Sequence, residues 1–285
     1  VSVIAWQSRG NAVEAVQREM RTALDGADQS LQLVFQAASQ RGRELLPIFV
    51  RTLGGEPTLD GTMVETGEAG QAPRLVIDGH TLNGDLGALR RMNENTGADP
   101  AVIVRANNRW VRAATLLKDE QGRERIGSTV DANDLIAKVL DKGVDYSGLV
   151  QRGSEWYALS IKPLRNASGS VYGGLTVRVN VNADVVRLLD WANKVTVAEH
   201  GTLAVLKRAP DGKGWIFLAG GGSTAGEVLG ANMTPQERAN LEALYNSHPQ
   251  GFSETPATHA SGARYVSWLV ADNWDWLMVG RGAQS

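Results

Sequence analysis

The sequence predicts an α+β protein in which a long N-terminal helix is followed by two modules, each built on an antiparallel β-sheet. The first observation is that apolar residues between Asn11 and Val50 recur every three or four positions, which is helical spacing. The second is an order of short apolar runs between Gly97 and Val181 that indicates two strands, a helix and three further strands. The third is that this order occurs again between Gly201 and Arg281. Two similar modules are therefore expected after the helix.

Composition limits the class of protein. The 285 residues are enough for two modest domains, and the net charge of −2 gives no sign of a nucleic-acid surface. There is no cysteine, which excludes disulfides and thiolate metal sites. The sequence contains no run of about eighteen apolar residues, which is the length that would predict a membrane-spanning helix. The first six residues, VSVIAW, fit the end of a transmembrane helix with Trp6 at the interface, or alternatively an ordinary frayed terminus.

The N-terminal helix is predicted to cover residues 1–50. About 38 helical residues extend roughly 57 Å, which is longer than a single small sheet. We therefore expect the helix to run alongside two modules, to form a dimer contact, or both. Its first half is rich in alanine, and we expect a parallel homodimer through Val13–Leu31. The alternative is a helix that packs only on its own sheets.

The membrane-distal module is predicted to span residues 51–182. Its first part, Arg51–Gln71, is rich in glycine and is expected to be a loop. A small hairpin across Asp78-Gly79 and a short helix at Leu86–Asn95 should follow. In the main sheet, Asn107-Asn108 is a hairpin turn signal because asparagine tolerates left-handed backbone. The predicted elements of this sheet are strands at 101–105 and 109–117, a helix at 134–140, and strands at 146–151, 156–162 and 171–179, a PAS-like layout.

The membrane-proximal module is predicted to span residues 183–285. It should begin with a helix at Ala183–Val197. Thr234, followed by Pro235 and Glu237, indicates the capped start of a second helix that ends near Tyr245. The predicted strands are 201–208 and 215–219 before this helix, and 251–253, 263–270 and 274–281 after it.

A series of short motifs occurs in a fixed order between residues 75 and 180. The motifs are GxxxNGD (Gly79, Asn83, Gly84, Asp85), TGAD (96–99), VRAAT (111–115), RIGST (125–129), GxxYxG (Gly143, Tyr146, Gly148) and Pro163-Leu164 with Gly169 and Gly173-Gly174. This order resembles the extracytoplasmic Cache sensor family, in particular its Cache 3–Cache 2 fusion type. The chain departs from the family at Ile161, where a second tyrosine is frequent, and at Asn166, where aspartate is usual. Both departures fall near the family's ligand pocket.

The resemblance implies a periplasmic ligand-binding domain of a bacterial transmembrane receptor, attached to the inner membrane by flanking helices outside this chain. It implies no enzyme activity, no cofactor and no metal. The expected output is chemotaxis signalling, with a histidine kinase or a diguanylate cyclase as the alternative. A soluble oligomeric binding protein is the rival class. We expect a small-molecule ligand, a carboxylate, and a homodimer in the full receptor.

The sequence gives little support for catalysis. The four histidines stand alone, without the partner three or four residues away that a metal site on one element shows. The run Gly220-Gly221-Gly222 lacks the Lys-Ser/Thr of a phosphate-binding loop. No serine lies in a nucleophile-elbow pattern. Binding is therefore the better-supported activity.

The candidate ligand-binding residues are Arg112, Thr115, Tyr146 and Tyr157. Arg112 lies between apolar neighbours in the strand Arg109–Leu117, and a guanidinium pairs two-fold with a carboxylate. The resemblance favours Arg112 and Tyr157. Strand alternation places Trp156 and Lys162 on the face opposite Tyr157, so they are expected outside the pocket. The alternatives are a structural ion pair for Arg112 and a core position for Tyr146.

Two further sets of residues are expected to be structural. Arg125, before Ile126-Gly127, is assigned a structural role. In the membrane-proximal module, Trp268, Trp274 and Trp276 are expected to pack against the sheet and the long helix. The alternative for these tryptophans is an aromatic cage around a ligand.

Overall fold

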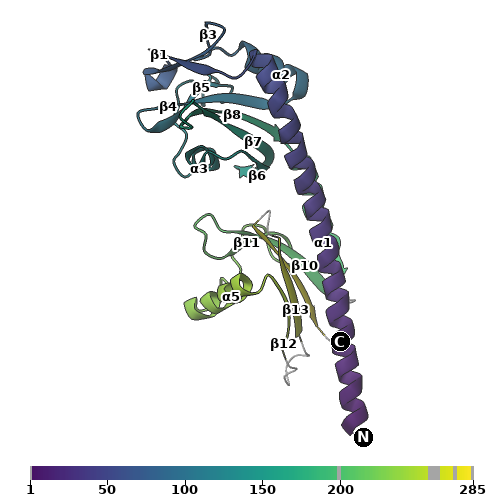
Figure 1. Ribbon diagram of the computed structural model, residues 1–285. Helices are drawn as coiled ribbons and strands as arrows, with labels where there is room; N and C mark the ends of the chain where they lie inside the picture. Colours follow the sequence, from purple (N-terminus) through teal and green to yellow (C-terminus); the bar gives the residue numbers. More distant parts are fainter. Residues whose placement is uncertain (1, 198–199, 256–263, 272–274, 284–285) are drawn as a thin grey trace. The chain divides into compact units, whose positions relative to one another are not determined.

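The computed structural model describes residues 2–197, 200–255, 264–271 and 275–283. The chain forms two compact units, one of residues 36–182 and the other of residues 1–35 with 183–285. We call them the distal and the proximal unit. Helix α1, Ser2–Leu53, is continuous through the boundary between them (Figure 1). The predicted long N-terminal helix is thus confirmed, and the two units are described separately below.

One face of α1 is buried by the chain itself. Met20, Leu24, Ala27 and Leu31 recur at steps of three and four and are at most 2% exposed. These four side chains belong to the stretch that the sequence suggested for a homodimer, and they are closed to a partner helix. Homodimerisation stays a prediction, and it requires other residues of α1 than these.

The distal unit contains a five-stranded antiparallel sheet in the order β5-β4-β8-β7-β6. Its strands are β4 (Asp99–Ala106), β5 (Arg109–Thr115), β6 (Tyr146–Arg152), β7 (Glu155–Arg165) and β8 (Val171–Asn180). Asn107 and Asn108 have φ angles of 50° and 59°, so the predicted hairpin turn between β4 and β5 is present.

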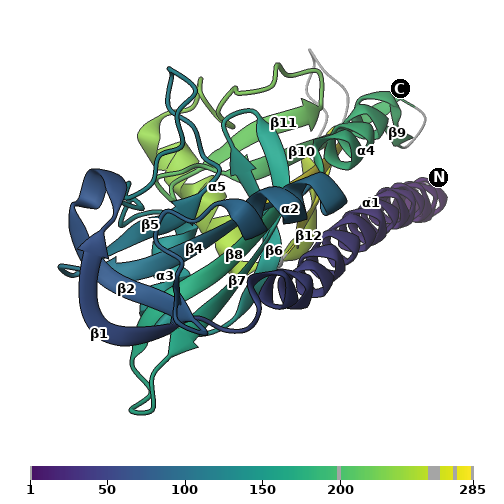
Figure 2. The ribbon, with the colours of Figure 1, turned by 90° about the horizontal axis from the view of Figure 1, so that it is seen from above.

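The two faces of this sheet are covered by different elements. The C-terminal end of α1, helix α2 (Gly87–Thr96) and strand β2 bury one face through Phe49, Leu75 and Leu89 with Val102 and Leu175. Figure 2 shows α2 crossing the sheet on this side. Helix α3 (Leu135–Lys142) covers the other face through side chains such as Leu140, which pack on Ile103 and Ile161. The two layers of helices hold the sheet between them, and the site described below lies on the α3 face.

A second, three-stranded sheet in the order β1-β2-β3 completes the distal unit. It consists of β1 (Thr58–Glu65), β2 (Gln71–Ile77) and β3 (His80–Thr81), with a 3-10 turn at Gly67–Ala69. The expectation of a loop over Arg51–Gln71 was wrong, because β1 occupies much of that range. Seven of the eight β1 residues are exposed, so the strand lacks the apolar alternation by which strands are read from sequence.

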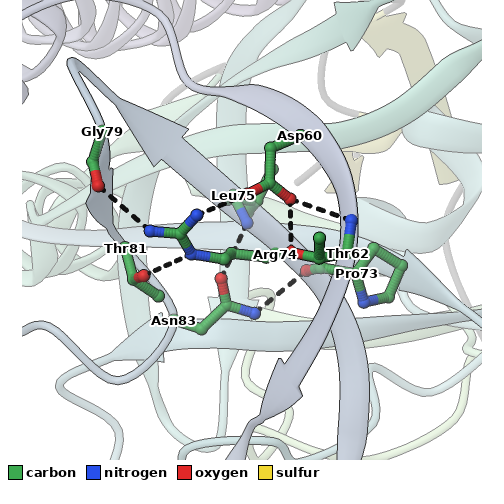
Figure 3. Close-up of polar contacts among 8 residues, drawn as sticks. All are labelled: Asp60, Thr62, Pro73, Arg74, Leu75, Gly79, Thr81 and Asn83. Carbon is green, nitrogen blue, oxygen red and sulfur yellow. Dashed lines mark hydrogen bonds and ion pairs between the residues drawn. The ribbon is translucent and has the colours of Figure 1, made fainter.

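Polar contacts fix this small sheet (Figure 3). The Arg74 guanidinium pairs with Asp60, and it donates to the Thr81 hydroxyl at 2.6 Å and the Gly79 carbonyl at 3.0 Å. Asn83 accepts from the Leu75 N–H at 2.8 Å and donates to the Pro73 carbonyl at 3.0 Å. The Asn-Gly-Asp motif therefore has a structural role here.

The proximal unit contains the second antiparallel sheet, in the order β11-β10-β14-β13-β12, with β9 paired to β10. Its helices are α4 (Asn182–Lys194) and α5 (Pro235–Ser247), and α5 begins with the predicted capping box of Thr234 and Glu237. The strands are β9 (Thr196–Val197), β10 (Gly201–Arg208), β11 (Trp215–Gly220), β12 (Gln250–Thr255), β13 (Arg264–Ala271) and β14 (Trp276–Ala283).

Each large sheet places its strands in the order second, first, fifth, fourth, third along the chain, counting β10 as the first strand of the proximal one. The predicted fold class, a long helix with two PAS-like sheets, is confirmed. Trp268 and Trp276 are buried, and the Trp268 indole N–H donates to the His248 carbonyl at 2.9 Å. Trp274 lies outside the described residues, as does His259.

Candidate functional site

The candidate site is a cavity of about 320 Å³ on the α3 face of the distal sheet. Five charged residues line it, together with two threonines and an apolar wall. The charged residues are Asp99, Arg112, Asp134, Arg152 and Arg178; the threonines are Thr115 and Thr176; the wall includes Pro100, Ala101, Leu116, Ile136, Val150 and Leu159. A cavity of this size, largely apolar with a few polar groups, is typical of a small-molecule site.

A β-bulge brings Arg112 and Thr115 to the same face. Residues three apart in a regular strand point to opposite faces. In β5, however, Ala114 pairs with Val102 whereas Arg112 pairs with Ile103, so one extra residue is inserted at Ala113. The Ala113 carbonyl accepts from the N–H of Gly84, at 2.7 Å, in the Asn-Gly-Asp loop. The extra residue therefore aligns two predicted ligand-binding side chains that the alternation rule would separate.

Arg112 is a largely buried cation with neutral partners. Its Nη1 donates to the Ser128 hydroxyl and the Thr129 carbonyl, both at 3.1 Å. Among the described residues, no carboxylate lies within ion-pair distance of this guanidinium. Burial lowers the pKa of Arg112 from its usual value; Asp134 raises it, and the nearby arginines 125, 152 and 178 lower it. Arg112 is therefore a cation whose free N–H groups can receive an anion.

Arg152 and Asp134 form a closed ion pair in the same cavity. Arg152 Nη1 and Nη2 donate to the two Asp134 carboxylate oxygens at 2.6 and 2.8 Å. Asp134 is also the N-cap of α3, since its Oδ1 accepts from the Ile136 N–H at 2.8 Å. This pair ties the start of α3 to the end of β6.

Arg178 is positioned by Tyr157 and Asp99 at the edge of the cavity. Its guanidinium lies over the Tyr157 ring, 4.6 Å from the ring centre, and its Nε is 3.8 Å from Asp99 Oδ2. Asp99 is itself oriented by Asn93, whose side-chain amide donates to Oδ1 at 3.0 Å. Tyr157 also donates to Glu155 Oε2 at 3.1 Å. Tyr157 thus supports Arg178 and does not line the cavity.

The structure brings together only part of the predicted set. Arg112 and Thr115 line the cavity, and Tyr157 lies beneath Arg178. Tyr146 is paired with Ile161 at the other end of β6, and its ring lies against Gly148, where any side chain would clash with the hydroxyl. Tyr146 belongs to the cluster that packs on α3, and burial raises its pKa. The structure therefore does not place Tyr146 beside Arg112.

The residues assigned to other roles are found away from the cavity. Trp156 is buried, and Lys162 pairs with Glu56 on the α1 side of the sheet. Arg125 pairs with Glu68 at 3.2 Å, in an exposed position that supports its structural assignment.

Asp99, Asp134, Arg152 and Arg178 were missed by the sequence reasoning. Arg178 had a signal: it lies between Val177 and Val179, just as Arg112 lies between Val111 and Ala113. The other three lie at the ends of elements, where charged residues are common, and only the tertiary fold brings them together.

Two further findings concern metal binding and membrane-spanning segments. In the part of the chain that the structure describes, no group of three or more potential metal ligands comes together. Within the same residues, none of the helices has a segment apolar and long enough to cross a bilayer.

Comparisons with known proteins agree with the fold. The periplasmic domain of RsbU from Chlamydia trachomatis is 13% identical, with a TM-score of 0.55, and the alignment covers 98% of this chain and 96% of that one. An extracellular domain described as part of a histidine kinase, mmHK1S-Z2, is 12% identical, with a TM-score of 0.51 and coverage of 94% and 96%. A search of the curated proteins found no match.

The family model of the Cache 3/Cache 2 fusion domain matches residues 5–285, which is nearly the whole chain. The match includes both sheets and α1, and the motif order seen in the distal unit agrees with it. The chain therefore belongs to the Cache 3/Cache 2 fusion domain family.

Proposed function

We propose that this chain is the periplasmic ligand-binding domain of a bacterial chemoreceptor, and that the distal cavity binds a small carboxylate through Arg112. The observation that carries the proposal is the Arg112 guanidinium, which is largely buried in a cavity of ligand size and bonded only to a hydroxyl and a carbonyl. A buried cation without a counterion is costly unless an anion binds to it. A ligand carboxylate supplies that anion.

The geometry of arginine suits this role. The planar guanidinium has five N–H donors, and Nη1 is the nitrogen that Ser128 and Thr129 engage. The remaining donors can form a two-fold pair with a carboxylate, which is shorter and stronger than a neutral hydrogen bond. The hydroxyl of Thr115, on the same face, is a second polar contact for the ligand.

Ligand binding is the activity that this arrangement supports. Membership of a sensor family supports a receptor attached to the membrane by segments outside this chain. A ligand that prefers one conformation of the domain shifts its population toward that conformation, and this is the signal that a receptor transmits.

The first experiment is a thermal-shift screen of the protein against small carboxylates and amino acids, followed by calorimetric titration. A ligand at 100 times its dissociation constant stabilises the folded protein by about 2.7 kcal/mol. Chemotaxis toward the ligand found, measured with and without the receptor gene, tests the output. A screen in which no carboxylate binds would overturn the assignment of the site.

The second experiment is Arg112→Ala. Loss of a charge-assisted pair is worth about 1.5–3 kcal/mol, so affinity should fall roughly ten- to a hundred-fold. Arg90→Ala is the matched control, since Arg90 is an exposed arginine of the same unit paired with Glu124. Tyr157→Phe should cost less, as it removes one neutral donor. Unchanged affinity of folded Arg112→Ala would exclude Arg112 from the site.

A further inference from the structure

We infer that the ligand is a small aliphatic monocarboxylate, and that the cavity rejects both amino acids and dicarboxylates. The inference rests on the proposed function and narrows it to one class of carboxylate. It follows from how the five charged side chains of the cavity pair with one another.

The cavity carries a single surplus positive charge. Three arginines and two aspartates line it, which gives +3 − 2 = +1. Asp134 neutralises Arg152 through two short hydrogen bonds, and Asp99 faces Arg178 at 3.8 Å. Arg112 is left without a carboxylate partner. One ligand carboxylate therefore brings the charge of the occupied cavity to zero.

An ammonium group on the ligand would find an arginine beside each carboxylate of the cavity lining. Both oxygens of Asp134 are used by Arg152, and one of them also caps α3. Asp99 accepts from Asn93 through Oδ1 and faces Arg178 through Oδ2. The α-ammonium of an amino acid bound at Arg112 would lie beside that cation and within the field of its neighbouring arginines. Like charges at such distances repel.

A second ligand carboxylate would leave the occupied cavity with a charge of −1. Arg178 is the one cation with a long ion pair, but Asp99 and Tyr157 fix its position. A second carboxylate at Arg178 would therefore lie close to the Asp99 carboxylate. This repulsion selects against dicarboxylates, and Asp99 is the residue that causes it.

The rest of the cavity suits an aliphatic body. Ala101, Leu116, Ile136, Val150 and Leu159 line it, and Leu159 is only 3% exposed. Burial of a ligand's methylene groups against this wall is favourable because it removes apolar surface from water. The volume of about 320 Å³ lies at the small end of the range for ligand pockets, which favours a short chain.

A matched set of ligands tests the inference. Calorimetric titration should compare linear monocarboxylates of two to six carbons with the 2-amino acid and the dicarboxylate of the same length; at five carbons these are pentanoate, 2-aminopentanoate and pentanedioate. At the length that binds most tightly, the monocarboxylate should bind at least tenfold more tightly than either analogue. Equal or tighter binding of an amino acid or a dicarboxylate would overturn the inference while leaving a carboxylate site intact. No binding by any member would overturn the proposed function itself.

The variant Asp99→Asn tests the cause of the selectivity. Removing this charge raises the net charge of the empty cavity to +2. Affinity for the dicarboxylate should therefore rise at least tenfold, and the preference for the monocarboxylate should shrink. A merely structural role of Asp99 would lower both affinities together. Asp131→Asn, which removes a charge from an exposed residue before α3 outside the cavity lining, is the control and should change neither. An unchanged ratio in Asp99→Asn would refute the role of this residue in rejecting dicarboxylates.

Discussion

The two sheets have the same strand order but use a half-buried arginine in opposite ways. In the proximal unit, Arg208 lies over the Trp215 ring at 4.3 Å and is surrounded by Asp275, Asn246 and Glu242 at 3.0, 3.2 and 3.5 Å. In the distal unit, Arg112 contacts only neutral groups. The same residue type on the same topology is therefore a structural group where counterions surround it and a binding group where they do not.

The two units also differ in the size of the side chains on one face of the sheet. In the proximal unit an aromatic cluster fills the space beneath α5, with Tyr245 and Trp268 in edge-to-face contact at 5.6 Å and Trp215 and Phe217 beside them. In the distal unit, small side chains such as Ala101 and Thr176 line the cavity. Large aromatic side chains fill one face of the proximal sheet, whereas small side chains in the distal unit leave room for a ligand.

Substitution of the two arginines should separate their roles. Arg208→Ala removes charge-assisted bonds and a cation–π contact, and should lower the free energy of unfolding by about 2–3 kcal/mol. Arg112→Ala should lower it by about 1 kcal/mol or less while reducing ligand affinity roughly ten- to a hundred-fold. Chemical denaturation measures both, with exposed Arg187→Ala as the control. A similar loss of stability for both variants would contradict the comparison.

The small β1-β2-β3 sheet belongs to the distal unit, and Asn83 connects it to the site. Asn83→Ala removes three hydrogen bonds, to Leu75, Pro73 and Thr66, and should cost about 2 kcal/mol. The neighbouring Gly84 supports the Ala113 carbonyl, so ligand affinity should fall as well. Melting curves and titration provide the test, with exposed Asn95→Ala as the control. A loss of stability without a change in affinity would show that the small sheet does not support the bulge.

The smallest expected effect concerns pH. Bonds from Thr62, with those from Arg74, lower the pKa of Asp60 from 3.8 to about 2. Because the folded-state value is the lower one, this carboxylate stabilises the distal unit above pH 4, and the contribution is lost as pH falls toward 2. Asp60→Asn should therefore show a shallower loss of stability between pH 4 and 2. An identical pH dependence in the two proteins would contradict the assigned pKa.

Most of the fold could be predicted because its signals are local. Helical spacing identified α1, Asn107-Asn108 identified a hairpin, and Thr234 with Glu237 identified the start of α5. Strand β1 could not be predicted, because an exposed strand carries no apolar pattern and Gly61, with a φ of 84°, interrupts it.

The site was harder to predict because it depends on partners. The apolar neighbours of Arg112 indicate burial, but no sequence pattern shows that its partners are Ser128 and Thr129. Asp134 and Arg152, which form an ion pair, are 18 residues apart in the sequence. Tyr146 and Val150 lie on the same face of β6, but only Val150 is at the end of the strand that lines the cavity. The sequence therefore indicated which types of side chain could bind a ligand. It did not indicate how far along a strand each one lies from the cavity, or which ion-pair partner it has.

The extra residue in β5 has a consequence for how such domains change their ligands. Because Ala113 is the extra residue, its deletion would leave a regular strand in which Arg112 and Thr115 are two positions apart and still share a face. The polar pair therefore tolerates the loss of this one codon, whereas the loss of a second residue between Arg112 and Thr115 would turn Thr115 away from the cavity. An alignment with a relative that lacks the bulge must place its gap at Ala113, because an ungapped alignment would equate residues that lie on opposite faces of the sheet.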